Sequence, residues 1–145
     1  MIGMGAGVGP SPVIYNSATP AELHIPSFDN GRRVQLVIIP LPGASRFHVN
    51  LRTGSDIALH FNPRFDENSV VCNSTSNGGW LNEERAGMPF HTERVYTLEF
   101  VSNYGQIQIL LNGTPFMSFA ERLPSSEIHS VEVGGDVHVH SAHIH

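Results

Sequence analysis

Short segments in which apolar and polar residues alternate follow one another along most of this chain, and this pattern limits the fold more than any other feature. In "RFHVNLR" the apolar Phe47, Val49 and Leu51 alternate with polar residues, and "SDIALHF" continues in the same way. Successive side chains of a β-strand point to opposite faces, so each segment predicts a strand with one buried face. We find no pattern typical of a long amphipathic helix. The chain is therefore expected to be all-β.

Many short strands, with no helix to cover a sheet face, predict two antiparallel sheets packed face to face or a closed barrel, and we favour the sandwich. The apolar run "VQLVII" indicates one strand that is buried more fully than its neighbours. Asn112-Gly113 predicts a two-residue hairpin. A length of 145 residues suits one domain. We expect residues 1–12, rich in Gly and Pro, to form a flexible arm and residues 13–145 to form the folded domain.

Charge and composition exclude several classes of function. The formal net charge is -5 and no basic block occurs, which disfavours binding to nucleic acid. No apolar run approaches the ~18 residues of a membrane span, so we expect no membrane insertion. The first residues lack the basic start and leucine-rich run of a signal peptide, so we expect folding in the cytoplasm. Cys72 is the only cysteine, which rules out an intramolecular disulfide.

A row of polar residues is the first candidate for a binding site. In the strand that ends in "LHFNPRF", the alternation sends Ile57, Leu59 and Phe61 into the core and sets His60, Asn62 and Arg64 on the opposite face. At two residues per step, these three span roughly 13 Å. The proline inside the row cannot donate to a ladder, so the strand is expected to be an edge there or to be locally irregular. The polar face would then stay accessible.

Further polar residues follow within a short distance along the chain. Asn73 falls on the same face as the row if Cys72 points to the core, and Glu83 and Arg85 share a face in an extended segment. Trp80 is the only tryptophan. Planar polar side chains suit the hydroxyls of a sugar, and an aromatic plate suits its C–H face. Partners placed for an axial hydroxyl would be left unpaired against an equatorial one, which would select galactose over glucose.

The motifs "HFNPRF", "VVCNS" and a tryptophan followed by "EER" occur here in order, and with them the chain resembles the galectins, the β-galactoside-binding lectins. The resemblance covers most of the chain, from about Tyr15 to the last strand. It implies the galectin fold, a concanavalin-like jelly-roll β-sandwich of two antiparallel sheets with a groove on the concave sheet. It implies no cofactor and no metal, and export without a signal peptide.

The resemblance also implies a role for each polar residue. His60, Asn62 and Arg64 would bind the galactose 4-hydroxyl and ring oxygen. Asn73 would bind the 6-hydroxyl, and Trp80 would stack on the face of the ring. Glu83 and Arg85 would reach the neighbouring sugar. The implied carbohydrate-binding residues are His60, Asn62, Arg64, Asn73, Trp80, Glu83 and Arg85.

Two features depart from the family pattern. Leu81 follows the tryptophan, where the family commonly has glycine, and the loop "DENS" is short. We expect an acidic residue of this loop, Asp66 or Glu67, to pair with Arg64 or Arg85.

The expected function is a non-catalytic lectin for β-galactosides such as lactose and N-acetyllactosamine. Its partners would be glycans on glycoproteins or glycolipids, which it would cross-link as a homodimer, and it would be found in the cytoplasm and outside the cell. The alternative is a galectin-like structural or protein-interaction module with weak or no sugar binding. A glycosidase is disfavoured because Glu83 and Glu84 are adjacent, so their carboxyl groups would point to opposite faces of a strand.

The C-terminal "HVHSAHIH" carries a second pattern. Histidines two apart share a strand face, and such pairs can chelate zinc or copper. Alternatively, the segment is a solvated terminal strand. A third hypothesis places it at a dimer contact, where histidines that become charged near pH 6 would weaken the association.

Overall fold

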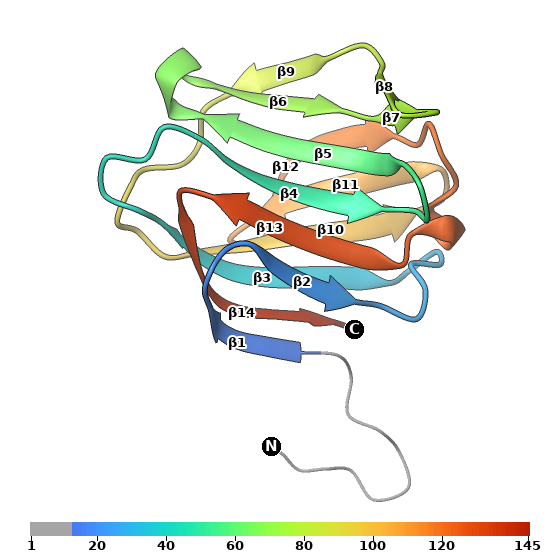
Figure 1. Cartoon of the computed structure of the whole chain (residues 1–145), viewed down its shortest axis with the longest axis horizontal. Coiled ribbons are helices and arrows are strands. Elements are labelled where there is room, and N and C mark those ends of the chain that lie inside the picture. Colours follow the sequence, from blue (N-terminus) through green and yellow to red (C-terminus); the bar gives the residue numbers. More distant parts are fainter. Residues whose placement is uncertain (1–12) are drawn as a thin grey trace, which may run out of the picture.

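Two six-stranded antiparallel sheets pack face to face in the computed structural model, which describes residues 13–145 (Figure 1). This confirms the predicted β-sandwich. Within those residues, the helical content is limited to two 3₁₀ turns, η1 (Phe65–Glu67) and η2 (Ser125–Glu127). Neither is long and apolar enough to cross a membrane. The arm predicted for residues 1–12 lies outside the described part of the chain.

The two sheets divide the strands as follows. One sheet has the order β1 (Val13–Ser17), β14 (Val137–Ile144), β3 (Arg33–Pro40), β10 (Tyr96–Asn103), β11 (Gln106–Leu111), β12 (Thr114–Ala120). The other, in front in Figure 1, has the order β2 (Ala21–His24), β13 (Ser130–Gly135), β4 (Phe47–Arg52), β5 (Ile57–Arg64), β6 (Ser69–Asn73), β9 (Glu84–Gly87). A separate two-stranded ribbon pairs β7 (Thr75–Ser76) with β8 (Gly79–Trp80).

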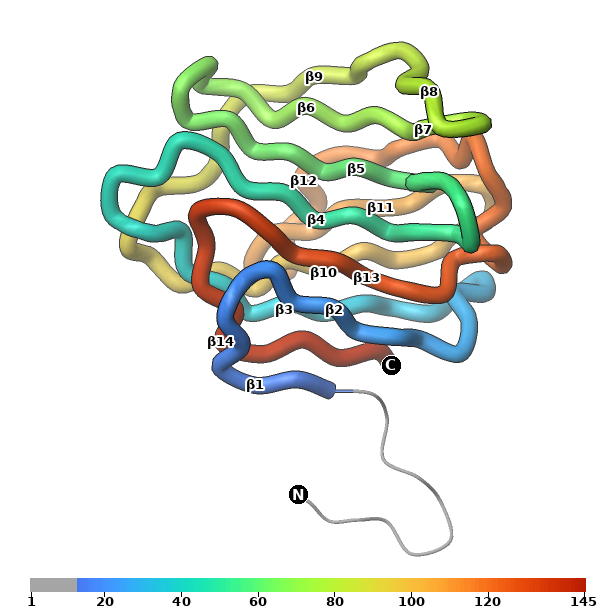
Figure 2. Tube along the Cα trace, viewed as in Figure 1, coloured from blue at the N-terminus to red at the C-terminus, as the bar shows by residue number. Residues whose placement is uncertain are grey.

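The chain passes between the two sheets several times. Figure 2 shows the trace crossing from β2 to β3 and from β9 to β10, and the first described strand, β1, lies beside the last, β14. The predicted hairpin at Asn112-Gly113 joins β11 to β12, and both of its residues have positive φ. Positive φ at both central residues is what a tight hairpin turn requires.

Aromatic side chains from both sheets meet in the core. Phe61 on β5 contacts Phe100 on β10 edge-on, with ring centroids 5.5 Å apart, and both rings are fully buried. Phe61 also approaches Phe116 on β12 at 6.5 Å. Burial of each such side chain contributes about 1.5–3 kcal/mol. The alternation on β5 therefore fixes which of its faces lies inside, and with it the face that remains for the polar row.

The prediction that "VQLVII" is more fully buried than its neighbours is wrong. On β3, Val34, Leu36 and Ile38 are buried, but Gln35 and Val37 between them are only partly covered. One face of β3 meets the opposite sheet, whereas the other is the outer surface of the sandwich. A continuous apolar run therefore occurs here on a strand that is covered on one side.

Candidate functional site

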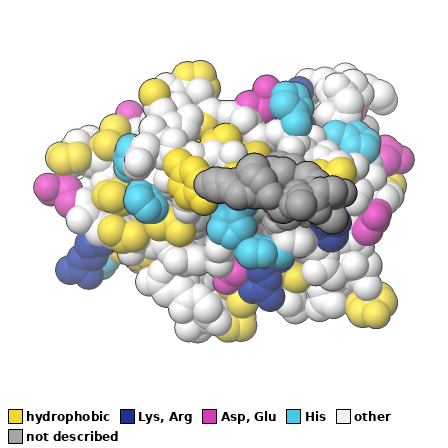
Figure 3. All heavy atoms as spheres, turned by 90° about the horizontal axis from the view of Figure 1, so that it is seen from below, with side chains coloured by type: hydrophobic (Ala, Val, Ile, Leu, Met, Phe, Trp, Pro, Cys, Tyr) yellow, Lys and Arg dark blue, Asp and Glu magenta, His cyan; other side chains and the backbone are white. Residues whose placement is uncertain are grey.

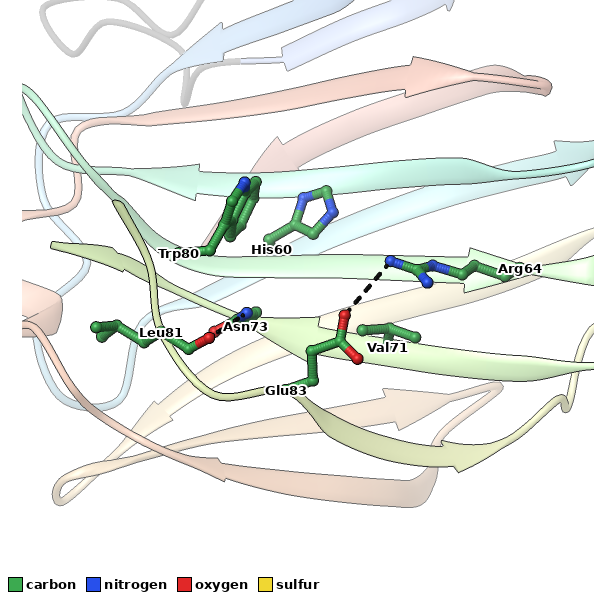
Figure 4. A pocket seen from close by; sticks show the side chains of 7 residues that line it. All are labelled: His60, Arg64, Val71, Asn73, Trp80, Leu81 and Glu83. Atoms are coloured by element: carbon green, nitrogen blue, oxygen red, sulfur yellow. Dashed lines mark hydrogen bonds and ion pairs between the residues drawn. The ribbon is translucent and has the colours of Figure 1, made fainter. Parts of the chain in front are cut away.

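A hollow of about 370 Å³ opens on the outer face of the sheet that contains β5 and β6. Figure 4 shows the side chains that line it: His60, Arg64, Val71, Asn73, Trp80, Leu81 and Glu83. Most of the implied carbohydrate-binding residues are among them. Asn62 and Arg85 are not among them, but each hydrogen bonds to a lining residue: Asn62 accepts from Arg64, and Arg85 donates to Glu83.

Strand register brings these residues together. His60 on β5 lies opposite Asn73 on β6, Asn62 lies opposite Val71, and Val71 in turn lies opposite Arg85 on β9. Opposite residues in an antiparallel pair share a face, so the predicted grouping of these side chains on one face is confirmed. Cys72 is fully buried on the other face, as expected, and burial raises the pKa of its thiol to about 12.

Asn62 compensates for the hydrogen bond that Pro63 cannot make. The pairs Val49 with Phe61 and Arg46 with Arg64 place Pro63 opposite Phe47. Phe65 N donates to Ser45 O two residues further along, which makes Phe47–Pro63 a hydrogen-bonded position of the ladder. Proline has no N–H, and the Asn62 side chain instead donates to the Phe47 carbonyl at 2.8 Å.

Of the two possibilities predicted for the strand at Pro63, an edge position or a local irregularity, the structure shows the irregularity. The strand is not an edge, because β5 lies between β4 and β6, but its pairing with β4 is interrupted at the proline. Asn62 is itself buried, and its Oδ1 accepts a hydrogen bond from Arg64 Nε at 2.8 Å. One N–H of its amide is left for a ligand.

His60 is held as a neutral ring with a defined acceptor. Its Nδ1 lies 2.6 Å from Asn50 Oδ1, and the Asn50 amide nitrogen donates to Glu132, so the oxygen of Asn50 faces the ring. Nδ1 therefore carries the proton and Nε2 is an acceptor. Burial, followed by the nearby charges of His48 and Arg64, lowers the pKa of His60 to about 4. The ring is uncharged at neutral pH.

A chain of ion pairs fixes the arginines. Glu67 accepts from Arg64 Nη1 at 3.1 Å and from Arg85 Nη1 at 2.8 Å, and Glu83 accepts from Arg85 Nη2 at 2.9 Å. The predicted pairing of the short loop with these arginines is confirmed for Glu67. The hydrogen bond from Arg85, together with that from Arg64, lowers the pKa of the Glu67 carboxyl. Arg64 also approaches Glu83 at 3.7 Å, as the dashed line in Figure 4 marks.

Asp66 has a different partner from the one expected. Arg46 donates to it through Nε and Nη2, at 3.0 and 2.9 Å, and also to Glu67 at 2.8 Å. Sequence analysis missed Arg46, which precedes β4 and lies opposite Arg64 across the sheet. The alternation in "RFHVNLR" places Arg46 on the polar face, but no local pattern indicated that it would meet the acidic loop after β5.

Trp80 stands on the β7–β8 ribbon and projects into solvent, with 56% of its surface exposed. Its indole lies beside the His60 ring, with centroids 4.9 Å apart and planes at 56° (Figure 4). The ribbon turns at Asn77-Gly78, and both residues have positive φ. Leu81 takes the place of the family glycine: its N–H donates to Ser74 O and its carbonyl accepts from Asn73, both at 2.9 Å.

Asp56, which sequence analysis also missed, holds this ribbon. Its carboxylate accepts from the Thr75 hydroxyl at 2.8 Å, from Gly78 N at 2.9 Å and from Asn77 N at 3.1 Å. The Gly78 amide, followed by the Thr75 hydroxyl, lowers the pKa of Asp56. The dipeptide Asn77-Gly78 could have predicted the turn from sequence. Nothing local predicted that Asp56 would close it.

Glu84 points away from the hollow, as the alternation predicted. It lies opposite the buried Cys72 and pairs with Arg122 at 3.0 Å.

The C-terminal histidines form no metal site in the described chain. His143 and His145 stack edge-on at 4.4 Å, but no group of three or more His, Cys, Asp or Glu side chains within residues 13–145 could hold a metal ion. Burial, then His145, lowers the pKa of His143.

Comparison with known proteins gives a consistent result. The model of the galactoside-binding lectin family matches residues 20–144. Galectin-7 of Rattus norvegicus is 42% identical over 106 residues, which cover 70% of this chain and 78% of that protein. A 32 kDa beta-galactoside-binding lectin of Haemonchus contortus is 44% identical over 96 residues, which cover 65% of this chain and 34% of that protein. The crystal structure of Caenorhabditis elegans galectin LEC-6 superposes with a TM-score of 0.91 at 51% identity, covering 96% of this chain and 99% of that one.

Proposed function

The chain belongs to the galectin family of galactoside-binding lectins, and from this premise we propose that it binds lactose and N-acetyllactosamine in the hollow beside Trp80. Family membership makes it a β-galactoside-binding lectin and not an enzyme.

The observation that carries the proposal is the fixed set of polar groups facing one exposed indole. His60 Nε2 can accept a hydrogen bond, while Asn62 retains one N–H and Arg64 lies with its guanidinium at the hollow. A hydroxyl is both donor and acceptor, so one galactose 4-hydroxyl can satisfy His60 and Arg64 together. The C–H face of the ring would rest on Trp80.

Selection against glucose follows from these partners. An equatorial 4-hydroxyl would leave the groups on β5 unpaired, at a cost of about 1–3 kcal/mol for each buried polar group. We propose that Asn73 contacts the 6-hydroxyl and that Glu83 and Arg85 contact the neighbouring sugar. Arg85 lies opposite Val71 on β9 and donates to both Glu67 and Glu83, which holds the guanidinium and the Glu83 carboxylate in position.

A titration monitored by the fluorescence of the only tryptophan tests the proposal. Lactose should change the emission, whereas sucrose and maltose should not. Arg64→Met should abolish the lactose response, because it removes the donors that face the 4-hydroxyl. Arg33→Met is the matched control, since Arg33 pairs with Glu99 on the other sheet. Lactose binding by Arg64→Met at the wild-type affinity would refute the site.

We also propose that the protein cross-links glycoproteins or glycolipids as a dimer outside the cell, after export without a signal peptide. Among the described residues, β1 pairs only with β14 and forms one edge of its sheet, with Tyr15 69% exposed. Figure 3 views this end of the molecule, where histidine and hydrophobic side chains gather. Sedimentation at pH 7.5 should show a dimer that dissociates at pH 5.5 as histidines become charged. The same sedimenting mass at both pH values would contradict the proposal that histidine charge controls the dimer.

The alternative of a galectin-like module without sugar binding predicts a different result. Such a protein would pass through a lactose-agarose column without retention. Retention, followed by elution with free lactose, would exclude it.

A further inference from the structure

We infer that Arg122 is a positioning residue of the sugar site, which reaches it from the opposite sheet and fixes Asn73 as a pure hydrogen-bond donor toward the 6-hydroxyl. The inference rests on the proposed function, because it concerns how one proposed contact is held. Neither the motif order nor the family resemblance assigns a role to Arg122.

The contacts of Arg122 connect the two sheets. The residue follows β12, in the sheet that packs behind the site, and its Nη1 donates to Asn73 Oδ1 at 2.9 Å. Its Nη2 donates to Glu84 Oε2 at 3.0 Å, and its guanidinium carbon lies 4.8 Å from the centroid of the Phe119 ring. Only 20% of its side chain is exposed. Glu84 and Phe119 therefore hold the guanidinium in one orientation against Asn73.

The hydrogen bonds of Asn73 determine what it can offer a ligand. Its Oδ1 accepts from Ser74 N at 2.7 Å and from Arg122, so both lone pairs are used. Its Nδ2 donates once, to Leu81 O at 2.9 Å, which leaves one N–H. Arginine has no acceptor, so its contact also requires the oxygen of the amide to face it. Asn73 can therefore donate one hydrogen bond to the hollow and accept none.

The charge of Arg122 strengthens that donor. A hydrogen bond from a cation to the amide oxygen is charge-assisted, and it polarises the amide so that the remaining N–H donates more strongly. Without Arg122, the oxygen of Asn73 would regain a free lone pair and the side chain would lose its support from behind. The contact to the 6-hydroxyl should then weaken, while the contacts on β5 to the 4-hydroxyl remain.

The experiment compares lactose with its 6′-deoxy analogue, which lacks only the galactose 6-hydroxyl. Calorimetric titration of the wild-type protein should show lactose binding about tenfold more tightly, as expected for one hydrogen bond to an ordered donor. In Arg122→Met, the ratio of the two affinities should fall to about threefold or less. Arg33→Met, which removes an arginine paired with Glu99 away from the hollow, should keep the wild-type ratio.

The ratio separates positioning from general loss of structure. A merely structural role would lower both affinities equally and leave the ratio unchanged, and that result would overturn the inference while lactose binding stood. Failure of the wild-type protein to bind lactose would instead overturn the proposed function. If Arg122→Met does not fold, the ratio of the two affinities is measured in Arg122→Lys instead. Lysine keeps the charge but lacks the planar fork whose two nitrogens donate separately to Asn73 and Glu84, so an unchanged ratio there would also overturn the inference.

Discussion

The two walls of the hollow are built in opposite ways. The β5 wall, with His60, Asn62 and Arg64, lies inside a six-stranded sheet between β4 and β6. The Trp80 wall is a ribbon of two two-residue strands outside both large sheets, and both residues of β8 are exposed. Sheet ladders and the core hold the first wall, whereas the carboxylate of Asp56 holds much of the second. Damage to the β5 wall should therefore cost both stability and binding, whereas damage to the ribbon should act mainly on binding.

The largest expected effect is on the β5 wall. Asn62→Ala leaves the Phe47 carbonyl without its donor and Arg64 Nε without its acceptor. We expect the free energy of unfolding in urea to fall by about 2 kcal/mol, because a buried carbonyl becomes unsatisfied. Lactose binding should be lost as well.

A second substitution separates these two effects. Pro63→Ala, added to Asn62→Ala, supplies a backbone N–H opposite Phe47 and should restore about 1 kcal/mol of stability without restoring lactose binding. If the double variant is no more stable than Asn62→Ala, the role of Asn62 as substitute donor is wrong.

The ribbon should respond differently. Asp56→Ala removes the acceptor for the Thr75 hydroxyl and for the amides of Asn77 and Gly78, so Trp80 loses its fixed position. Lactose affinity should fall about tenfold, since each lost hydrogen bond to a charged group weakens the ordered ribbon. The lactose affinity of Asp56→Asn, which keeps one acceptor oxygen, should lie between those of Asp56→Ala and the wild type. Equal lactose affinity in Asp56→Ala and the wild type would show that the ribbon keeps its conformation without Asp56.

The stability of the protein should depend on pH through His60 on the β5 wall. Its pKa is about 4 in the folded protein, mainly because of burial, and the ordinary value is 6.5. Between these values the unfolded chain binds a proton that the folded protein does not. The free energy of unfolding should therefore fall as the pH is lowered from about 6.5 to about 4.

Substitution of His60 tests this assignment. His60→Asn should reduce the dependence of the free energy of unfolding on pH in that window, because the shifted group is removed. An identical slope in His60→Asn and wild type would assign the effect to other groups.

The smallest effect is expected at the edge of the β5 wall. Arg46→Met releases Asp66 and removes one of three arginines from Glu67, but Arg64 and Arg85 still bind that carboxylate. Exposed ion pairs contribute little, so lactose affinity should fall only about twofold. A tenfold loss in the same titration would mean that Arg46 contacts the sugar itself.

Much of the site could be predicted because it depends on period and register. Alternation placed His60, Asn62 and Arg64 outward, and the same rule separated Glu84 from Glu83 and Arg85. The residues that were missed are those whose contacts span long distances along the chain. Asp56 closes a turn about twenty residues later, and Arg122 reaches Asn73 at a separation of 49 residues. No local sequence pattern predicts contacts between residues so far apart in the chain.

The sequence by itself determined the class of fold, the outward face of the strands that carry the polar residues of the site, and the family, because side-chain alternation and the motif order are local properties. The tertiary structure alone decided that Asn62 replaces the N–H of Pro63, that Asp56 holds Trp80 and that Arg122 supports Asn73. It also decided that β3 is covered on one face, against its apolar composition. These outcomes depend on which strands become neighbours, and only the pairing of the two sheets brings those groups within hydrogen-bond distance.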